Sequence, residues 1–304
     1  MEIVNIHVDE LNCLVYTPGM NLNLFQDLLA VPSVSGREDC MVAFLKEHIQ
    51  ARGLGRVWSD AHKNVYVVKG DAEFFPTFAA HTDTVQPFDR KVYIFKRGDV
   101  FVGCDDKGEQ AGIGGDCKSG IMVCLEALER LDNVACVFFA FEEYGCKGAF
   151  NSDPDFFKNV GWVAEFDCPG RNLCSYTSSG VRLFQNDGDF IQRALPAFQS
   201  RGTLWQHHPY TDVMALRKRF PISCLNLSSG YYNWHSDQEY VRISDTEHAV
   251  ELAVELAGRL GAESYPFPIN GAHKCYARPL IEVGPLVVRD EVLEKELRRQ
   301  PKPK

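Results

Sequence analysis

The sequence of 304 residues contains no apolar run that approaches the roughly 18 residues needed for a membrane-spanning helix. Its first twenty residues include Glu2, His7, Asp9 and Glu10, which interrupt the apolar stretch that a secretory signal peptide would require. We therefore expect no membrane partner and a cytoplasmic location.

An excess of positive charge is also lacking. Lys and Arg number 32 against 41 Asp and Glu, so the formal net charge is -9. A nucleic-acid partner, which usually needs a concentrated basic surface, is disfavoured, whereas a metal cofactor fits this balance. The compact basic run LRRQPKPK ends the chain and is expected to be a solvated tail.

The eleven cysteines include no C-x-x-C pair and have no short regular spacing. This pattern disfavours both a disulfide scaffold and a zinc ribbon. Reduced thiols that pack as small buried apolar side chains are the simpler interpretation.

Apolar periodicity divides the chain into helices and strands. Residues 22–53 predict two helices separated at residues 32–36, and later helices are predicted at 119–131, 211–220 and 244–261, the last capped by Ser244 or Asp245. Strands are predicted at 64–68, 76–81, 135–141, 161–166 and 222–227, with a hairpin over 91–103.

The runs ACVFFAF and GWVAEF are continuously apolar, which is typical of strands that are buried on both faces. We therefore predict an α/β protein, a three-layer α/β/α sandwich around a mixed, mostly parallel sheet. The sequence shows no internal repeat or linker. We expect an N-terminal extension at residues 1–20, a single catalytic domain at 21–285, and a C-terminal helix with the basic tail at 286–304.

Five short segments place metal-ligand residue types directly after predicted buried strands or in the loops beyond them. These segments are HTD at 81–83, GGDCKSG at 114–120, EEYG at 142–145, EFD at 165–167 and WHSDQE at 234–239. Each segment alone is weak evidence for a metal site, since a single His at a strand end is more often a structural residue than a metal ligand. Because ligands of open α/β sheets bind at the carboxyl ends of the strands, we expect the five segments to converge.

The order and residue types of these segments resemble the two-zinc exopeptidase superfamily, which includes tripeptidase T, leucyl aminopeptidases and acetylornithine deacetylases. The resemblance runs from VPSVSGRE near residue 32 to WHSDQEYV near residue 241. Only about 70 residues separate the EFD and WHSDQE segments, too few for the inserted lid domain of the larger relatives. The resemblance therefore favours the branch without a lid.

The resemblance implies a complete set of metal ligands. Asp116 would bridge two metals, His81 and Asp167 would complete one site, and Glu143 and His235 would complete the other. Two Zn²⁺ ions are expected, although Co²⁺ or Mn²⁺ would suit the same oxygen and imidazole ligands. Without cations, three converging carboxylates would repel one another and raise their pKa values.

Two acidic residues are expected to assist the chemistry. The resemblance makes Glu142 the catalytic base, and burial at the strand ends should raise its pKa toward neutrality. Asp83 lies on the same side of an extended chain as His81, so its carboxylate is expected to accept a hydrogen bond from the imidazole nitrogen that does not bind metal.

Several residues near these segments have weaker claims. Tyr231 or Tyr232 could donate to a developing oxyanion, but ordinary packing is the stronger interpretation. His207 and His208 are expected to be structural or to lie on the surface. Lys118 is expected to be either a surface charge or helix-start residue, or a residue that supports the metal ligands. The cysteines beside the ligands are expected to pack.

The sequence therefore predicts a zinc-dependent hydrolase that acts on a peptide, most simply an aminopeptidase or small-peptide exopeptidase. An N-acyl amino acid deacylase would use the same metal site. The sequence therefore does not distinguish a peptide substrate from an N-acyl amino acid. A non-catalytic binding protein of the same fold is a weaker alternative, because no ligand and no base has been lost. The sequence does not reveal the oligomeric state.

Overall fold

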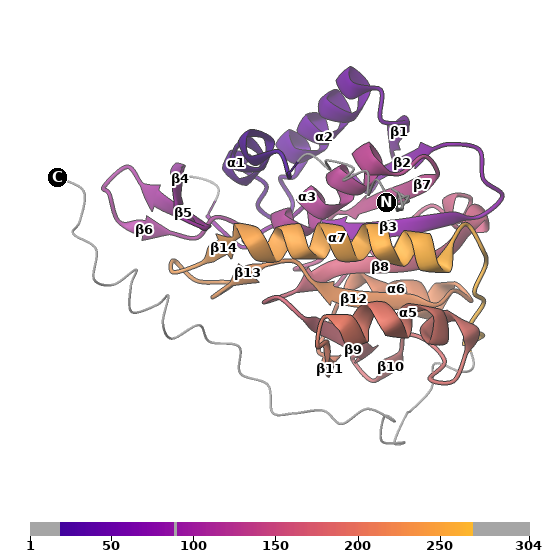
Figure 1. The fold of residues 1–304 in the computed structure, drawn as a ribbon. Helices are drawn as coiled ribbons and strands as arrows, with labels where there is room; N and C mark the ends of the chain where they lie inside the picture. Colours follow the sequence, from indigo (N-terminus) through magenta and orange to yellow (C-terminus); the bar gives the residue numbers. More distant parts are fainter. Residues whose placement is uncertain (1–18, 88–89, 270–304) are drawn as a thin grey trace, which may run out of the picture.

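The structure, a computed structural model, describes residues 19–87 and 90–269. A large mixed sheet forms its centre (Figure 1). The strand order is β1-β2-β7-β3-β8-β12-β9-β10, and β11 pairs with β9. The bounds are β1 Arg56–Ser59, β2 Val65–Lys69, β3 Phe75–His81, β7 Val134–Phe139, β8 Val160–Cys168, β9 Leu173–Ser178, β10 Val181–Arg182, β11 Leu204–His208 and β12 Cys224–Ser228.

The centre of the sheet is parallel, because β7, β3, β8 and β12 pair in parallel register. Antiparallel pairs flank them, with β2 beside β7 and β9 beside β12. Every residue of β3, β7, β8 and β12 is buried, which explains why these segments read as apolar runs. The carboxyl ends of the four strands therefore meet at one edge of the sheet.

Helices cover both faces of the sheet, so the predicted α/β sandwich is confirmed (Figure 1). On one face, α3 (Gly115–Arg130) packs against β3 and β8 and against α7 (Ile243–Leu260), which also contacts α5 (Asp189–Ser200). On the other face, α4 (Lys147–Phe150) packs on α6 (Asp212–Arg219), which lies against β12. The N-terminal helices are α1 (Leu22–Ala30) and α2 (Asp39–Arg52), and a 3-10 turn, η1, spans Phe156–Asn159.

A smaller sheet lies at the end of the large sheet where β3 finishes (Figure 1). Its order is β13-β14-β5-β4, and β6 pairs with β5. The bounds are β4 Val92–Arg97, β5 Val100–Asp105, β6 Gln110–Ala111, β13 Tyr231–Tyr232 and β14 Tyr240–Arg242. This sheet joins the predicted hairpin to the segment that carries His235, so it brings residues 92–111 beside residues 231–242.

Within the described residues, the predicted helices and strands agree with the structure except at the start of α7. Neither Ser244 nor Asp245 caps this helix, because its N-cap residue is Arg242 and the cap makes no side-chain hydrogen bond. The Asp245 carboxylate instead accepts hydrogen bonds from the side chains of Arg171 and Tyr232. The expected cap was therefore wrong, since tertiary partners occupy its side chain.

The cysteine prediction agrees with the structure, in which all nine cysteines of the described residues are free and seven are buried. No helix of the described residues is both long enough and apolar enough to cross a membrane. Most of the predicted N-terminal extension and the whole of the predicted C-terminal helix and tail lie outside the described residues.

Candidate metal centre

Asp116 lies between the two histidines that the sequence singled out. Its Oδ1 is 3.1 Å from Nε2 of His81, and its Oδ2 is 3.3 Å from Nε2 of His235. Each carboxylate oxygen therefore faces a different imidazole, as a bridging ligand requires. These hydrogen bonds hold the pKa of Asp116 below its usual value, although burial opposes the shift.

Asp116 reaches this position because α3 approaches the sheet closely. A Cβ atom at Gly120, one turn further along α3, would lie 2.2 Å from the backbone oxygen of Phe166 in β8. Only glycine fits there, so the helix brings Asp116 against the strand that carries Asp167. The sulfhydryl of Cys117 donates to the same Phe166 oxygen at 2.9 Å.

The first half of the cluster comes from the ends of β3 and β8. Nε2 of His81 is 3.3 Å from Oδ1 of Asp167, and both side chains are buried. Burial raises the pKa of Asp167 well above its usual value. Burial opposes protonation of His81, but the neighbouring acidic groups raise its pKa well above the usual value for histidine.

The second half comes from two loops. Nε2 of His235 lies 2.8 Å from Oε1 of Glu143, and hydrogen bonds to Asp116 and Glu143 raise the pKa of His235 to about 10. His235 has a positive φ of 58°, a conformation that costs a non-glycine residue about 1 kcal/mol or more. The fold therefore holds this imidazole toward the cluster at some cost in backbone strain.

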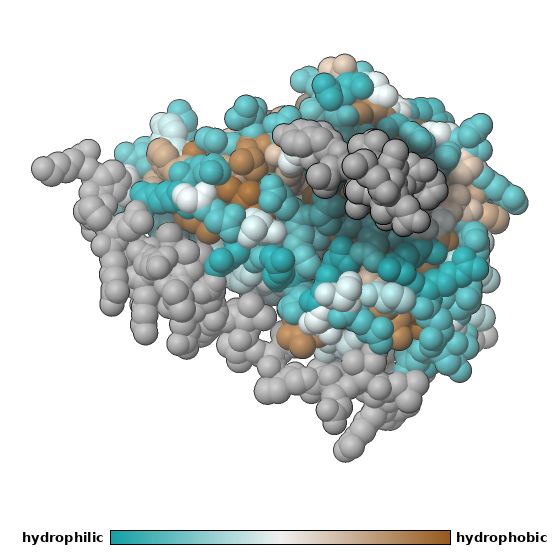
Figure 2. All heavy atoms as spheres, in the orientation of Figure 1, coloured by the Kyte–Doolittle hydropathy of each residue, from teal (hydrophilic) through white to brown (hydrophobic). Residues whose placement is uncertain are grey.

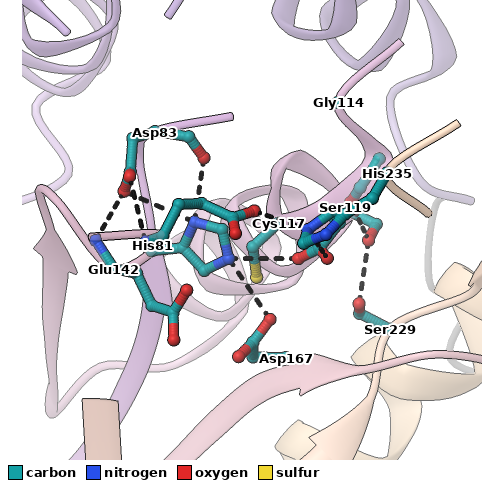
Figure 3. A network of polar contacts seen from close by, with 12 residues as sticks. His81, Asp83, Gly114, Cys117, Ser119, Glu142, Asp167, Ser229 and His235 are labelled. Atoms are coloured by element: carbon teal, nitrogen blue, oxygen red, sulfur yellow. Dashed lines mark hydrogen bonds and ion pairs between the residues drawn. The ribbon is translucent and has the colours of Figure 1, made fainter. Parts of the chain in front are cut away.

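Glu142 follows β7 and lies beside the cluster without pairing to either histidine among the described contacts (Figure 3). Burial raises its pKa to about 8, with added repulsion from Glu143 and Asp116. The direction agrees with the pKa expected of a base that must both take and return a proton near neutral pH. Its Oε1 lies 3.5 Å from the Cys146 sulfur.

Asp83 was predicted to accept a hydrogen bond from His81 through its carboxylate, but the accepting atom is its backbone oxygen. Nδ1 of His81 bonds to the backbone oxygen of Asp83 at 2.9 Å, whereas the nearer carboxylate oxygen is 3.6 Å away. The Asp83 carboxylate instead accepts the backbone N–H groups of Glu142 at 2.9 Å and Glu143 at 3.2 Å, and the Ser35 hydroxyl at 2.6 Å. Asp83 therefore holds the strand end and the two-glutamate loop together.

Glu239 is a residue whose place in the site the sequence did not reveal. Its carboxylate accepts the backbone N–H groups of Ile113, Gly114 and Asp116 at 2.7 to 3.1 Å, and the Nε2 group of Gln86 at 2.9 Å. Burial raises its pKa to about 7. The presence of a glutamate four residues after His235 was visible in the sequence, but its contacts with the 113–116 loop were not.

The remaining candidates are occupied by structural contacts. The Lys118 ammonium is buried and donates to the backbone oxygens of Leu29 and Ile113, so it is not a surface charge. Tyr232 donates to Asp245, which argues against its use as an oxyanion donor. The two ring nitrogens of His207 pair with the hydroxyl groups of Tyr176 and Thr177.

The donor set suits divalent cations. Ligand atoms of His81, Asp116 and Glu143 all lie within 4.8 Å of one another, and those of His81, Cys117 and Asp167 do the same. Carboxylate and imidazole are ligands that zinc accepts. Two dications would also offset three converging acidic side chains that are otherwise removed from water. The residues therefore fit a bound divalent cation, and His81 belongs to both groups.

Comparisons with protein-family models and with curated proteins find no match. The chain is nevertheless similar in structure to aminopeptidase PepT from Bacillus cereus, with a TM-score of 0.64 and 14% identity, over 77% of this chain and 96% of that chain. A tripeptidase from Staphylococcus aureus gives a TM-score of 0.63 at 14% identity, over 77% and 96%.

Aminopeptidase APDkam598 from the archaeon Desulfurococcus kamchatkensis gives a TM-score of 0.63 at 14% identity, over 79% of this chain and 94% of that chain. At these identities the likeness concerns the fold. The chain therefore shares its fold with aminopeptidases, and its activity must be argued from its own residues.

Proposed function

We propose that this chain is a metal-dependent hydrolase that cleaves a peptide bond next to a free N-terminus, as an aminopeptidase or small-peptide exopeptidase. The observation that carries the proposal is the placement of the two Asp116 oxygens, one facing His81 and the other facing His235. The aminopeptidase fold of the similar structures supports the choice of a peptide substrate.

His81, Asp116 and Asp167 would hold one Zn²⁺, and Asp116, Glu143 and His235 would hold the other. Such a pair polarises the scissile carbonyl and lowers the pKa of the attacking water. The bond from His81 Nδ1 to the Asp83 backbone oxygen fixes the imidazole so that Nε2 faces the cluster.

Glu142 would take the proton of the attacking water at its carboxylate and return it to the leaving amine. Its partly buried position keeps the carboxyl near the cluster, and a pKa raised to about 8 makes the protonated form accessible near neutral pH. A bound cation lowers this pKa, so the ionised form would predominate before attack. Asp83 holds the Glu142 backbone N–H while the side chain carries the proton.

Metal analysis and a substrate panel test the proposal. The purified chain is expected to contain about two equivalents of zinc per chain and to cleave amino-acid arylamides and dipeptides. N-acetyl amino acids form the contrasting set of substrates. Turnover of that set alone would refute the peptidase assignment and indicate a deacylase.

Glu142 provides the matched test of mechanism. The Glu142→Gln variant is expected to keep its zinc and to lose about 10²- to 10⁴-fold in turnover. Equal turnover of the variant and the wild type would refute the assigned base, and the absence of any turnover in the wild type would favour a binding protein.

A further inference from the structure

A cavity of about 760 Å³ lies between α1, β4 and the segment of residues 112–118 that leads into α3. We name it the α1–β4 cavity. Its volume falls within the range of about 300 to 1,000 Å³ that is typical of small-molecule sites. None of the proposed metal ligands lines it. Figure 2 shows hydrophobic side chains gathered on this part of the surface, between α1 and the small sheet.

One side of the cavity is apolar. Leu29 and Val31 line it from the end of α1, Val92 and Ile94 line it from β4, and Ile113 lines it from the segment before α3. An apolar wall of this kind favours a ligand with a hydrocarbon or aromatic body.

The cavity also contains a buried positive charge. Lys118 lines it and is 5% exposed, and its ammonium donates to the backbone oxygens of Leu29 at 2.9 Å and Ile113 at 3.2 Å. An ammonium has three N–H donors, so the described contacts leave one without an acceptor. Both acceptors are uncharged, and the Glu239 carboxylate acts on this ammonium without a hydrogen bond to it, whereas a buried cation is stabilised best by a bonded anion.

Two further polar atoms of the cavity wall have no hydrogen-bond partner among the described residues. These are the hydroxyl oxygen of Ser33 and Oε1 of Gln86, and both atoms are buried. The amide nitrogen of Gln86 is used by Glu239, so its oxygen is the free end of the group. Buried polar atoms in native structures usually have a partner, and a bound ligand would supply one.

We propose that the α1–β4 cavity binds a small molecule that carries a carboxylate on an apolar body. The Lys118 ammonium and the Ser33 hydroxyl donate to the carboxylate, and the Leu29, Val92 and Ile113 side chains contact the apolar body. Gln86 Oε1 accepts from a hydroxyl or amine of the ligand where one is present. This site does not depend on the hydrolase proposed above, because neither metal nor turnover is needed for binding.

Benzoate is a suitable probe, and benzamide is its uncharged counterpart. Calorimetric titration of the full-length chain is expected to give a Kd for benzoate of about 1 mM, a value reasonable for a ligand of this size. Benzamide is expected to bind about tenfold more weakly, because it lacks the charge that pairs with Lys118. The titrations are repeated after treatment with EDTA, because a carboxylate bound to metal would then be lost.

Two variants probe the cavity in different ways. Lys118→Met removes the cation and is expected to weaken benzoate binding about tenfold, whereas Val92→Trp fills the space and should abolish binding. Lys96→Met is the matched control, because Lys96 is an exposed lysine of β4 that does not line the cavity. It should bind benzoate within about twofold of the wild type.

Three results would overturn the proposal: no binding of benzoate at millimolar concentrations, equal affinity for benzamide, or binding that is lost with the metal. Val92→Trp tests occupancy of the cavity while Lys118 itself stays in place. Unchanged benzoate affinity in Val92→Trp would place the probe elsewhere and would also overturn the proposal.

Discussion

The backbone N–H group of Asp116 donates to Oε1 of Glu239 at 3.1 Å, while the side chain of Asp116 faces His81 and His235. Glu239 therefore fixes the backbone of the residue proposed to bridge two metals. It also lies four residues after His235, so one carboxylate ties the two ligand-bearing loops together.

Replacing this carboxylate should weaken metal binding. Glu239→Gln is expected to lower zinc affinity by about 10- to 100-fold, because an amide group cannot accept from all four N–H donors that now point at the carboxylate. Competition with a chromophoric chelator measures the change. Asp237→Asn, an exposed neighbour that pairs with Arg90, is the control and should keep wild-type affinity. Equal affinity in all three proteins would show that Glu239 does not support the site.

The shared position of Asp116 predicts a difference in stoichiometry. Asp116→Asn should lose tight binding at both sites, because each oxygen faces a different histidine. Glu143→Gln should lose one equivalent and keep the other, because Glu143 pairs with His235 and not with His81 in the described contacts. Zinc content after gel filtration distinguishes the two variants. Retention of one tight zinc by Asp116→Asn would contradict the bridging role.

Asp83 offers a test of positioning at a residue that faces away from the metals. Asp83→Asn is expected to reduce kcat by about 10- to 100-fold, because the asparagine amide cannot accept from both the Glu142 and the Glu143 N–H groups as the carboxylate does. Ser35→Ala removes only the hydroxyl donor on the same carboxylate and should change kcat much less. Steady-state kinetics on an arylamide substrate compare the two variants. Similar losses in both would assign the effect to local packing.

The raised pKa of Glu142 predicts a pH dependence of the metal-free protein. Its folded-state pKa of about 8 lies above the usual value of 4.5, so protonation favours the folded state. This contribution is fully present below pH 4.5 and is lost as the pH rises through 8. The free energy of unfolding in EDTA should therefore fall between pH 5 and pH 9.

The Glu142→Gln variant, which cannot ionise at this position, should show a smaller fall over the same range. Urea unfolding at each pH gives the comparison. Glu47→Gln on the exposed face of α2 serves as the surface control. A fall of equal size in wild type and Glu142→Gln would exclude Glu142 as its source.

The sequence by itself was sufficient for the elements of the core. The apolar runs at residues 135–141 and 161–166 predicted strands buried on both faces, and these became β7 and β8. The break at residues 32–36 predicted the boundary between α1 and α2. Such local periods are visible because burial selects side chains one turn or one pleat at a time.

The apolar pattern of residues 170–210 did not predict the helix and strands that this segment forms. It contains β9, α5 and β11, and β11 pairs in parallel with β9 at the side of the sheet. β11 is only five residues long and its exposed and buried positions do not alternate, and α5 contains Pro196, which argues against a helix. Tertiary packing against α7 outweighs that local signal.

The sequence determined which residue types the site would contain, because five short segments carry them in a fixed order after predicted strands. Only the tertiary structure decided which atoms meet: the Asp83 backbone oxygen rather than its carboxylate at His81, and the Glu239 carboxylate on the loop of Asp116. The physical reason is range. The pattern of neighbouring residues determines a strand or a helix. A hydrogen bond between residues 123 positions apart depends instead on how every intervening element packs.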